Sequence, residues 1–361
     1  MSLFRRRLMI ANALKKSSGI NYPGLIAAWS AKGKTNDDED RDILRDLTGN
    51  GHDITLNGFA FSEMSGYNGY NTNFKNWKVY GNNESYYQTE IISGIKIKSR
   101  IGGGGGYALL NMFNQQTIYN VIHLKIEGLE RNNASFNFGR GNDYYFPEHK
   151  QVDGVYEIDI NKFLIDHNIS NGEAGFKIFD RSSNSIIRDA DIFIELLPEY
   201  PDALVFDGVD DYGINESMPI LTDYTVIVNR RYIETEKNSC LISKAAGVGK
   251  GAFIMELIQG NSNKIYNYSF NDFGISKLYT STGISWLNTT SYNGIRVGKG
   301  DGIDTNSIFM GAPRKGDNRR FKGAFYSAYL FDRSLDEQEI KEFIRKYIDP
   351  EYLLPSEQTT E

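Results

Sequence analysis

The chain has 361 residues, a formal net charge of −6 at pH 7 and 13% aromatic residues, with 36 glycines but only 8 prolines. This length accommodates two domains with separate cores, and the composition is typical of short strands joined by glycine turns. The acidic charge argues against a nucleic-acid-binding body, and the single cysteine, Cys240, excludes an intramolecular disulfide scaffold. Cys240 lies in an apolar run and is expected to be a small buried side chain.

The N-terminal residues have the spacing of a short amphipathic helix. Phe4 and Leu8 fall near one side of residues 3–16, with basic residues around them. A helix below ~12–15 residues is marginal in water without a surface to pack on, so we expect residues 1–22 to be a docking segment. Packing on the chain's own domain is the main alternative, and binding to a membrane or to nucleic acid is the less favoured one. The residues expected to carry the docking are Phe4, Arg5, Arg6, Arg7 and Leu8.

The sequence lacks the features of export and of membrane insertion. The apolar stretch 8–14 is short, contains Asn12 and runs into two lysines without a cleavage site. No apolar run approaches the ~18 residues that span a bilayer. We therefore expect neither a signal peptide nor a membrane anchor.

Residues 23–61 predict the first strands of a β domain. The run LIAAWSA carries Trp29 and is expected to be a buried strand. After an acidic loop, the glycines at 49–51 supply the positive φ angles of a tight turn. Ile54 and Leu56 then alternate with polar residues, as in a half-buried strand.

Residues 62–200 change in character and predict a second β-sandwich. Ile122, Leu124 and Ile126 alternate with polar residues, which is typical of an antiparallel strand with one buried face. Strands at this close spacing favour a sandwich. The five consecutive glycines at 102–106 are expected to form a loop tip. Further strands are expected at 95–98, 134–138, 155–160, 175–179 and 192–196.

Strands resume in residues 201–349, which end in the only long helix that the sequence predicts. The helix is expected over 335–347, with Ser334 and Glu337 as a capping box. Its apolar stripe consists of Ile340, Phe343, Ile344 and Tyr347. The expected strands are 204–206, 224–228, 241–243, 252–257, 265–270 and 325–331, and residues 350–361 form a tail.

An acidic turn follows the strand at 204–206. In the run DGVDD the glycine permits a tight turn, and the acids can accept hydrogen bonds from turn amides. Carboxylates at a sandwich rim are also ligands that Ca²⁺ prefers. The turn-forming interpretation is favoured because no fixed ligand spacing is present. The candidate Ca²⁺ ligands are Asp207, Asp210 and Asp211, and no other cofactor is expected.

Motifs of catalysis are absent or incomplete. The sequence contains no HExxH, CxxC or GxSxG pattern. The run Glu157-Ile158-Asp159-Ile160-Asn161 resembles the Glu-x-Asp-x-Glu strand of retaining glycosidases on concanavalin-type sandwiches. Asn161 replaces the last carboxyl and cannot serve as the acid. We therefore expect no enzymatic activity.

Four stretches together resemble a laminin-G-like, concanavalin A-like jelly roll. They are Trp29 with its strand, DLTGNGHDITL at 46–56, LVFDGVDDY at 204–212 and GAFYSAYLFDRSL at 323–335. The resemblance covers residues 23–60 and 202–348 and implies an all-β fold. The expected domains are a discontinuous jelly roll of residues 23–61 and 201–349, with the second sandwich of residues 62–200 inserted into it.

The N-terminal arrangement, FRRRL followed by GLIAAWSAKGKTNDDEDRD, resembles proteins encoded by phages of gut Bacteroidales, crAss-like phages included. The resemblance implies a virion structural protein of capsid-decoration, head-fibre or tail-fibre type, assembled in the host cytoplasm. Its expected partners are other virion proteins, further copies of itself and host or mucus glycans, with no nucleic acid and no membrane. The alternatives are a bacterial surface carbohydrate-binding protein, which predicts an export signal, and a glycoside hydrolase, which predicts paired carboxylates in a cleft.

Overall fold

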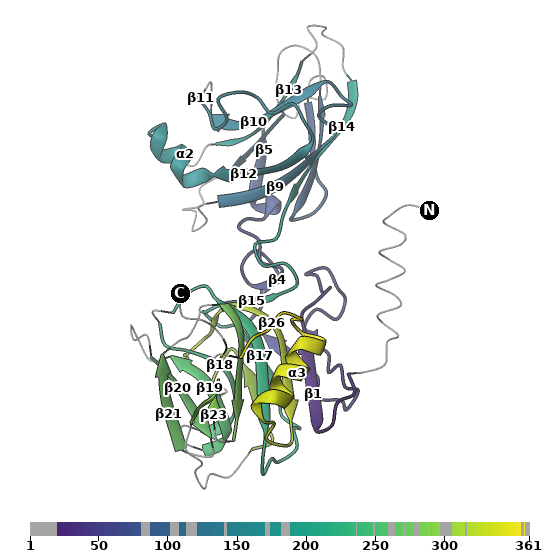
Figure 1. Cartoon of the computed structure of the whole chain (residues 1–361). Helices are drawn as coiled ribbons and strands as arrows, with labels where there is room; N and C mark the ends of the chain where they lie inside the picture. Colours follow the sequence, from purple (N-terminus) through teal and green to yellow (C-terminus); the bar gives the residue numbers. More distant parts are fainter. Residues whose placement is uncertain are drawn as a thin grey trace. The chain divides into compact units, whose positions relative to one another are not determined.

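The computed structural model describes residues 20–80, 87–101, 108–112, 121–140, 143–169, 174–181, 188–235, 237–247, 250–258, 264–269, 272–277, 282–289, 291–296, 305–314, 316–354 and 357. The chain divides into two compact units (Figure 1). Unit 1 comprises Met1–Gly69 and Tyr200–Glu361, and unit 2 comprises Tyr70–Glu199. Both units are built from antiparallel sheets, so the expected all-β sandwich architecture is confirmed.

The first sheet of unit 1 is centred on its last strand, β26. Its order is β24 (Ile295–Arg296), β23 (Ser291–Tyr292), β22 (Thr282–Asn288), β17 (Thr225–Tyr232), β26 (Lys322–Phe331), β15 (Leu204–Asp207) and β4 (Gly66–Tyr67), with β1 (Leu25–Ser30) also paired to β26. Trp29 of β1 lies opposite Ala328, and Leu204 of β15 lies opposite Phe325. The segments before and after the insertion therefore both pair with the same strand, β26.

The second sheet of unit 1 joins the same two segments again. Its order is β2 (Ile43–Leu44), β3 (Ile54–Asn57), β16 (Tyr212–Asn215), β25 (Ile308–Met310), β18 (Ser239–Gly247), β19 (Lys250–Ile258), β20 (Lys264–Ser269) and β21 (Asp272–Lys277). β3 pairs with β16 across the insertion, with Tyr212 opposite Asn57. Ile54 and Leu56 of β3 are buried, as their alternation predicted.

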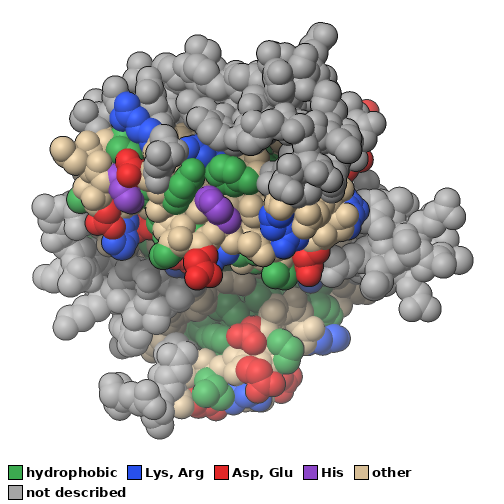
Figure 2. All heavy atoms as spheres, turned by 90° about the horizontal axis from the view of Figure 1, so that it is seen from above, with side chains coloured by type: hydrophobic (Ala, Val, Ile, Leu, Met, Phe, Trp, Pro, Cys, Tyr) green, Lys and Arg blue, Asp and Glu red, His purple; other side chains and the backbone are tan. Residues whose placement is uncertain are grey.

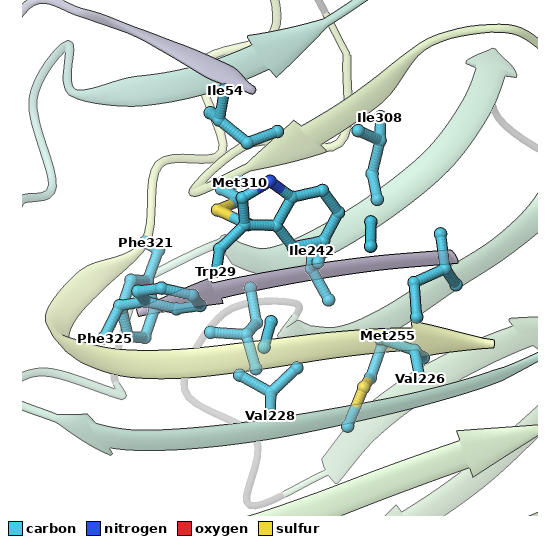
Figure 3. Close-up of a cluster of buried hydrophobic side chains, with 14 of the residues drawn as sticks. Trp29, Ile54, Val226, Val228, Ile242, Met255, Ile308, Met310, Phe321 and Phe325 are labelled. Atoms are coloured by element: carbon cyan, nitrogen blue, oxygen red, sulfur yellow. The ribbon is translucent and has the colours of Figure 1, made fainter. Parts of the chain in front are cut away.

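The core of unit 1 lies between these sheets and surrounds Trp29 (Figure 3). The Trp29 ring is fully buried, and its Nε1 donates a hydrogen bond of 2.7 Å to the His52 carbonyl. Asp46 organises the adjoining turn by accepting hydrogen bonds from the amides of Ala28 and His52. Both partners come from the stretch that the sequence predicted to be a strand and a turn. The side chains that Figure 3 labels around Trp29 are Ile54, Val226, Val228, Ile242, Met255, Ile308, Met310, Phe321 and Phe325.

An ion pair is buried between the two sheets. Arg230 of β17 binds Glu256 of β19 through two hydrogen bonds, Nε to Oε2 at 3.0 Å and Nη2 to Oε1 at 2.8 Å. The hydroxyls of Tyr232 and Tyr292 also donate to Glu256. Burial alone would raise the pKa of Glu256, but the charge and hydrogen bonds of Arg230 lower it on balance. Both groups thus stay ionised and satisfied in the core.

The C-terminal helix α3 (Glu337–Tyr347) starts two residues later than predicted, so the expected Ser334–Glu337 capping box is wrong. The amide of Leu335 donates to Thr225 Oγ1, which ties this residue to the sheet and delays the helix. Asp336 and Glu339 form the capping box instead. The predicted stripe of α3 packs into a second cluster, where Tyr22 also stacks edge-on against Phe343.

Unit 2 is a sandwich of two five-stranded sheets in the described residues. One has the order β11 (Asp143–Tyr144), β10 (Ala134–Arg140), β13 (Gly175–Asp180), β8 (Ala108–Met112) and β5 (Trp77–Tyr80), with the 3-10 helix η1 (Phe74–Asn76) before β5. The other has the order β12 (Gly154–Asp159), β9 (Val121–Glu127), β14 (Arg188–Leu196), β7 (Lys96–Ile101) and β6 (Tyr87–Ile91). Its core contains Ile122, Leu124, Ile126, Phe136, Phe138 and Phe176.

Two sequence expectations for this region differ from the structure. The strand expected at 155–160 ends at Asp159, whose side chain accepts from the Lys162 amide and caps helix α2 (Ile160–Asp166). The helix is favoured because Ile160 and Phe163 enter the core together. Residues 62–69, assigned to the insertion, belong to unit 1 because β4 pairs with β15.

Other expectations fall outside the described residues. These are the docking residues Phe4 to Leu8 and the glycine loop at 102–106. The last residues of the docking segment, Ile20 and Tyr22, are described and pack on unit 1 near α3. Within the described ranges, no helix combines the length and apolarity that crossing a bilayer demands.

The two segments of unit 1 that flank unit 2 are hydrogen-bonded to each other, which predicts that the insertion is dispensable for folding. The Tyr200 amide donates to the Asn68 carbonyl at 2.9 Å, and the Asn68 amide donates to the Ala203 carbonyl at 2.7 Å. Deleting residues 70–199 and joining Gly69 to Tyr200 through two glycines should therefore leave a folded unit 1. Circular dichroism should show a β spectrum and a cooperative melt. A disordered spectrum would contradict the prediction.

We expect the stability of unit 1 to depend strongly on both charges of the buried ion pair. Glu256→Gln leaves Arg230 charged in the core and should lower the free energy of unfolding by about 3–5 kcal/mol. Urea unfolding followed by tryptophan fluorescence measures the loss. Arg45→Gln is the matched control, because Arg45 is 53% exposed beside Asp53 and such pairs contribute at most about 1 kcal/mol. A loss from Glu256→Gln no larger than that of the control would contradict the prediction.

Candidate functional site

The acidic turn joins β15 to β16 at one end of unit 1. Gly208 has φ +79°, and a side chain there would approach Lys322 Cβ to 2.8 Å, so the turn requires glycine. The Val209 amide donates to Asp207 Oδ1 at 2.7 Å. The structure brings the three predicted acids together, with carboxylate oxygens of Asp207, Asp210 and Asp211 within 4.8 Å of one another.

Asp211 is the buried member of this group. Its carboxylate accepts hydrogen bonds from the Ser65 hydroxyl at 3.0 Å and from the Asp207 amide at 2.9 Å. Burial raises the pKa of Asp211 to about 7, so it is half protonated near neutral pH. The three acids could offer oxygen ligands to a hard cation. The carboxylates of Asp207 and Asp211 already accept hydrogen bonds in the fold, so their positions are explained without a bound cation.

A cleft of about 470 Å³ opens beside the acidic turn, and we call it the rim cleft. It is formed by the end of β15, the residues between β17 and β18, and the loop that leads into β26. This volume lies in the range of small-ligand sites, roughly 300–1,000 Å³. The lining residues are Asp207, Gly208, Val209, Glu234, Lys237, Asn238, Ser239, Asn318, Arg320 and Lys322.

Most of the charges in the rim cleft are paired within it. Lys322 Nζ lies 2.9 Å from Glu234 Oε2, and Lys237 Nζ lies 3.2 Å from Glu234 Oε1. The Lys322 hydrogen bond lowers the pKa of Glu234, which is therefore ionised at neutral pH. The guanidinium of Arg320 is different, because it lies 4.7 Å above the ring of Tyr212 and forms no ion pair with any described residue.

Two residues that line the rim cleft each carry a buried polar atom without a hydrogen-bond partner in the described part of the chain. They are the hydroxyl of Ser239, a residue that is only 2% exposed, and Nη1 of Arg320. A buried polar atom left unpaired costs about 1–3 kcal/mol. Native proteins rarely retain such atoms, and here the two belong to residues that line one cavity. Ser239 and Arg320 are therefore the residues of the rim cleft with unused hydrogen-bonding capacity.

The sequence predicted only the acidic turn beside this cleft. Asp207 was singled out, but Ser239 and Arg320 were not. Ser239 begins β18 and Arg320 precedes β26, so they are distant in sequence and neither carries a motif. Only the sheet order brings them to the same end of the sandwich.

The other sequence candidates form no comparable site. His123 bridges two carboxylates in unit 2, with Nδ1 2.8 Å from Glu199 Oε1 and Nε2 3.2 Å from Glu157 Oε2. Asp159 caps α2, so the Glu157 run does not continue as one strand of alternating acids. Cys240 is fully buried, and burial raises the pKa of its thiol. On the face that Figure 2 presents, acidic, basic, histidine and hydrophobic side chains lie interspersed.

Comparisons with known proteins assign no family to the chain. No family model matches it. No curated protein matches it either. Similar solved structures include a Trypanosoma rangeli sialidase in complex with sialic acid, at 10% identity and a TM-score of 0.28, covering 96% of this chain. The chain spans only 38% of the length of that sialidase chain.

Two further structures show likeness of the same order. A second T. rangeli sialidase structure has 10% identity and a TM-score of 0.28, with 85% of this chain and 68% of that chain covered. The full extracellular region of zebrafish Gpr126/Adgrg6 has 13% identity and a TM-score of 0.20, with 70% of this chain and 36% of that chain covered. Likeness at these TM-scores supports no conclusion about activity.

The buried carboxyl of Asp211 predicts a pH-dependent loss of stability. Its pKa is about 7 when folded and 3.8 in the reference state, so the folded protein holds the extra proton between these values. The resulting stabilisation is complete below pH 3.8 and is lost as pH rises through 7, at up to about 1.4 kcal/mol per pH unit. Asp211→Asn should match the wild type near pH 4 and exceed its stability at pH 8.

Urea unfolding from pH 4 to pH 8 in the presence of a chelator measures this difference. Asp210→Asn is the matched control, since Asp210 is exposed on the same turn and its change should stay within about 0.5 kcal/mol. Parallel pH profiles of the wild type and Asp211→Asn would show that the Asp211 carboxyl is not protonated in the fold.

Proposed function

We propose that this chain is a non-enzymatic display protein whose unit 1 binds carbohydrate in the rim cleft. The observation that carries the proposal is that two residues lining one cavity of small-ligand size, Ser239 and Arg320, each carry a buried, unpaired hydrogen-bonding atom. Without a ligand these groups destabilise the fold, which is a common compromise at binding sites.

The chemistry of the lining suits a polyhydroxylated ligand. Asp207 supplies acceptors, Asn238 and Asn318 supply both donors and acceptors, and Ser239 supplies a hydroxyl. Val209 is 73% exposed and adds an apolar surface beside them. A sugar has hydroxyl groups for the polar side chains and C–H faces for such a surface. Asp207 ends β15 and Ser239 begins β18, so two of these groups lie on strands, which favours a fixed binding geometry.

The setting that we propose for this protein is a virion, as a decoration or fibre component assembled in the host cytoplasm. This part of the proposal is supported by the sequence resemblance of the N-terminal region alone. Residues 1–22 would attach the protein to other virion proteins, and the two sandwiches would be displayed. Several copies in one particle would raise weak sugar binding by avidity.

Ser239 gives the sharpest test of carbohydrate binding at the rim cleft. Its buried hydroxyl is unpaired, so Ser239→Ala should leave the free energy of unfolding unchanged or raise it by about 1 kcal/mol. The same variant should weaken binding to the glycans that the wild type retains on an array of neutral and acidic glycans. The expected loss for one hydrogen bond is about 3- to 10-fold in affinity.

Ser243 on the same strand is the matched control. Its buried hydroxyl donates to the Pro313 carbonyl at 2.6 Å, so Ser243→Ala should destabilise the fold by about 1 kcal/mol and leave glycan binding unchanged. A wild-type protein that binds no glycan on the array, or that cleaves the glycans it binds, would overturn the proposed function.

A further inference from the structure

We propose that the rim cleft selects saccharides that carry a carboxylate, and that Arg320 is the residue that determines this selectivity. The inference rests on the proposed carbohydrate-binding function and adds the chemical class of the sugar. It starts from the Arg320 guanidinium, which is positioned by the Tyr212 ring but forms no ion pair with a described residue.

Arg320 is positioned by contacts that use none of its side-chain donors. Its guanidinium stacks over Tyr212, and its backbone amide bonds to the Asn318 carbonyl at 3.0 Å. The side chain of the preceding Arg319 donates two hydrogen bonds, of 2.8 and 2.6 Å, to the Asp317 carboxylate, and these stabilise the loop. Stacking on an aromatic ring orients a guanidinium without using its N–H groups. Nη1 therefore remains without a partner among the described residues.

The acids of the rim cleft do not compensate this charge. Glu234 is engaged by Lys237 and Lys322, and Oδ1 of Asp207 accepts from the Val209 amide. The lining contains three basic side chains and two acidic ones, so it carries a positive excess of one in a chain of net charge −6. Asp210 and Asp211 lie on the adjacent turn but outside the lining.

A carboxylate is the group that fits these features best. The guanidinium presents parallel N–H donors that match the two oxygens of a carboxylate. Ser239 lines the same cleft and carries the second unpaired donor. The side-chain amides of Asn238 and Asn318 and the Asp207 carboxylate can form hydrogen bonds with the hydroxyl groups of the same sugar. A neutral sugar would leave the charge of Arg320 without a counter-ion, so the cleft should bind it more weakly than an acidic sugar.

The experiment compares matched polymers with and without the acid group. The full-length protein is titrated with polygalacturonate, alginate and hyaluronan, each beside its carboxyl-reduced counterpart, at physiological salt. We expect at least one native polymer to bind and its reduced counterpart to bind at least 10-fold more weakly. Arg320→Gln should weaken binding to that native polymer by about 10- to 100-fold and leave the unfolding midpoint unchanged.

Two further variants separate geometry from charge. Arg320→Lys keeps the charge but not the paired donors, so its affinity should lie between those of the wild type and Arg320→Gln. Arg314→Gln removes a charge from the same loop outside the cleft, where Arg314 is 44% exposed beside Asp317, and should bind like the wild type.

The possible failures are distinguishable. Equal binding of native and carboxyl-reduced polymers would overturn the acid selectivity and leave the carbohydrate site standing. Undiminished binding by Arg320→Gln, or an equal loss in Arg314→Gln, would overturn the role of Arg320. Absence of binding to all six polymers would overturn the inference, and the glycan array then decides whether the proposed function fails with it.

Discussion

The fold of unit 1 depends on the pairing of its last strand with segments from both sides of the insertion. β26 carries β1 and β15 along one edge and β17 along the other. The N-terminal strand therefore reaches its place only when the C-terminal strand is present. Such long-range pairing is costly in chain entropy, and the burial of Trp29 and its neighbours offsets that cost.

The two sheets of unit 1 are joined by polar as well as apolar contacts. Arg230 and Glu256 come from opposite sheets, and the tyrosine hydroxyls around them complete the hydrogen bonding of the pair. A buried pair of this kind adds little net stability but penalises any register that separates its members. The apolar core and the ion pair thus specify the same alignment of the sheets.

The rim cleft follows from this alignment. Strand ends and loops at one end of the sandwich place Asp207, Ser239 and Arg320 around one cavity. Their supporting contacts differ in kind: an Asx turn holds Asp207, the start of β18 holds Ser239, and an aromatic stack holds Arg320. Rigid strands beneath variable loops are a common arrangement for binding sites. In this chain they leave hydrogen-bonding capacity unused, which is why we place the ligand there.

The sequence by itself determined the features that depend on local pattern. The alternation of Ile54 and Leu56, the period of Ile122 to Ile126 and the stripe of α3 were each predicted correctly, because period two and period 3.6 are visible over a few residues. The cap of α3, the helix α2 and the placement of residues 62–69 were not. In each case a contact with a distant strand or core decided the local structure, as when the Leu335 amide donates to Thr225 of β17. The acids of the turn were visible as a motif, whereas Ser239 and Arg320 were not. Only the tertiary structure decided that these two residues share a cleft, because strand order is set by long-range pairing and burial rather than by neighbours in sequence.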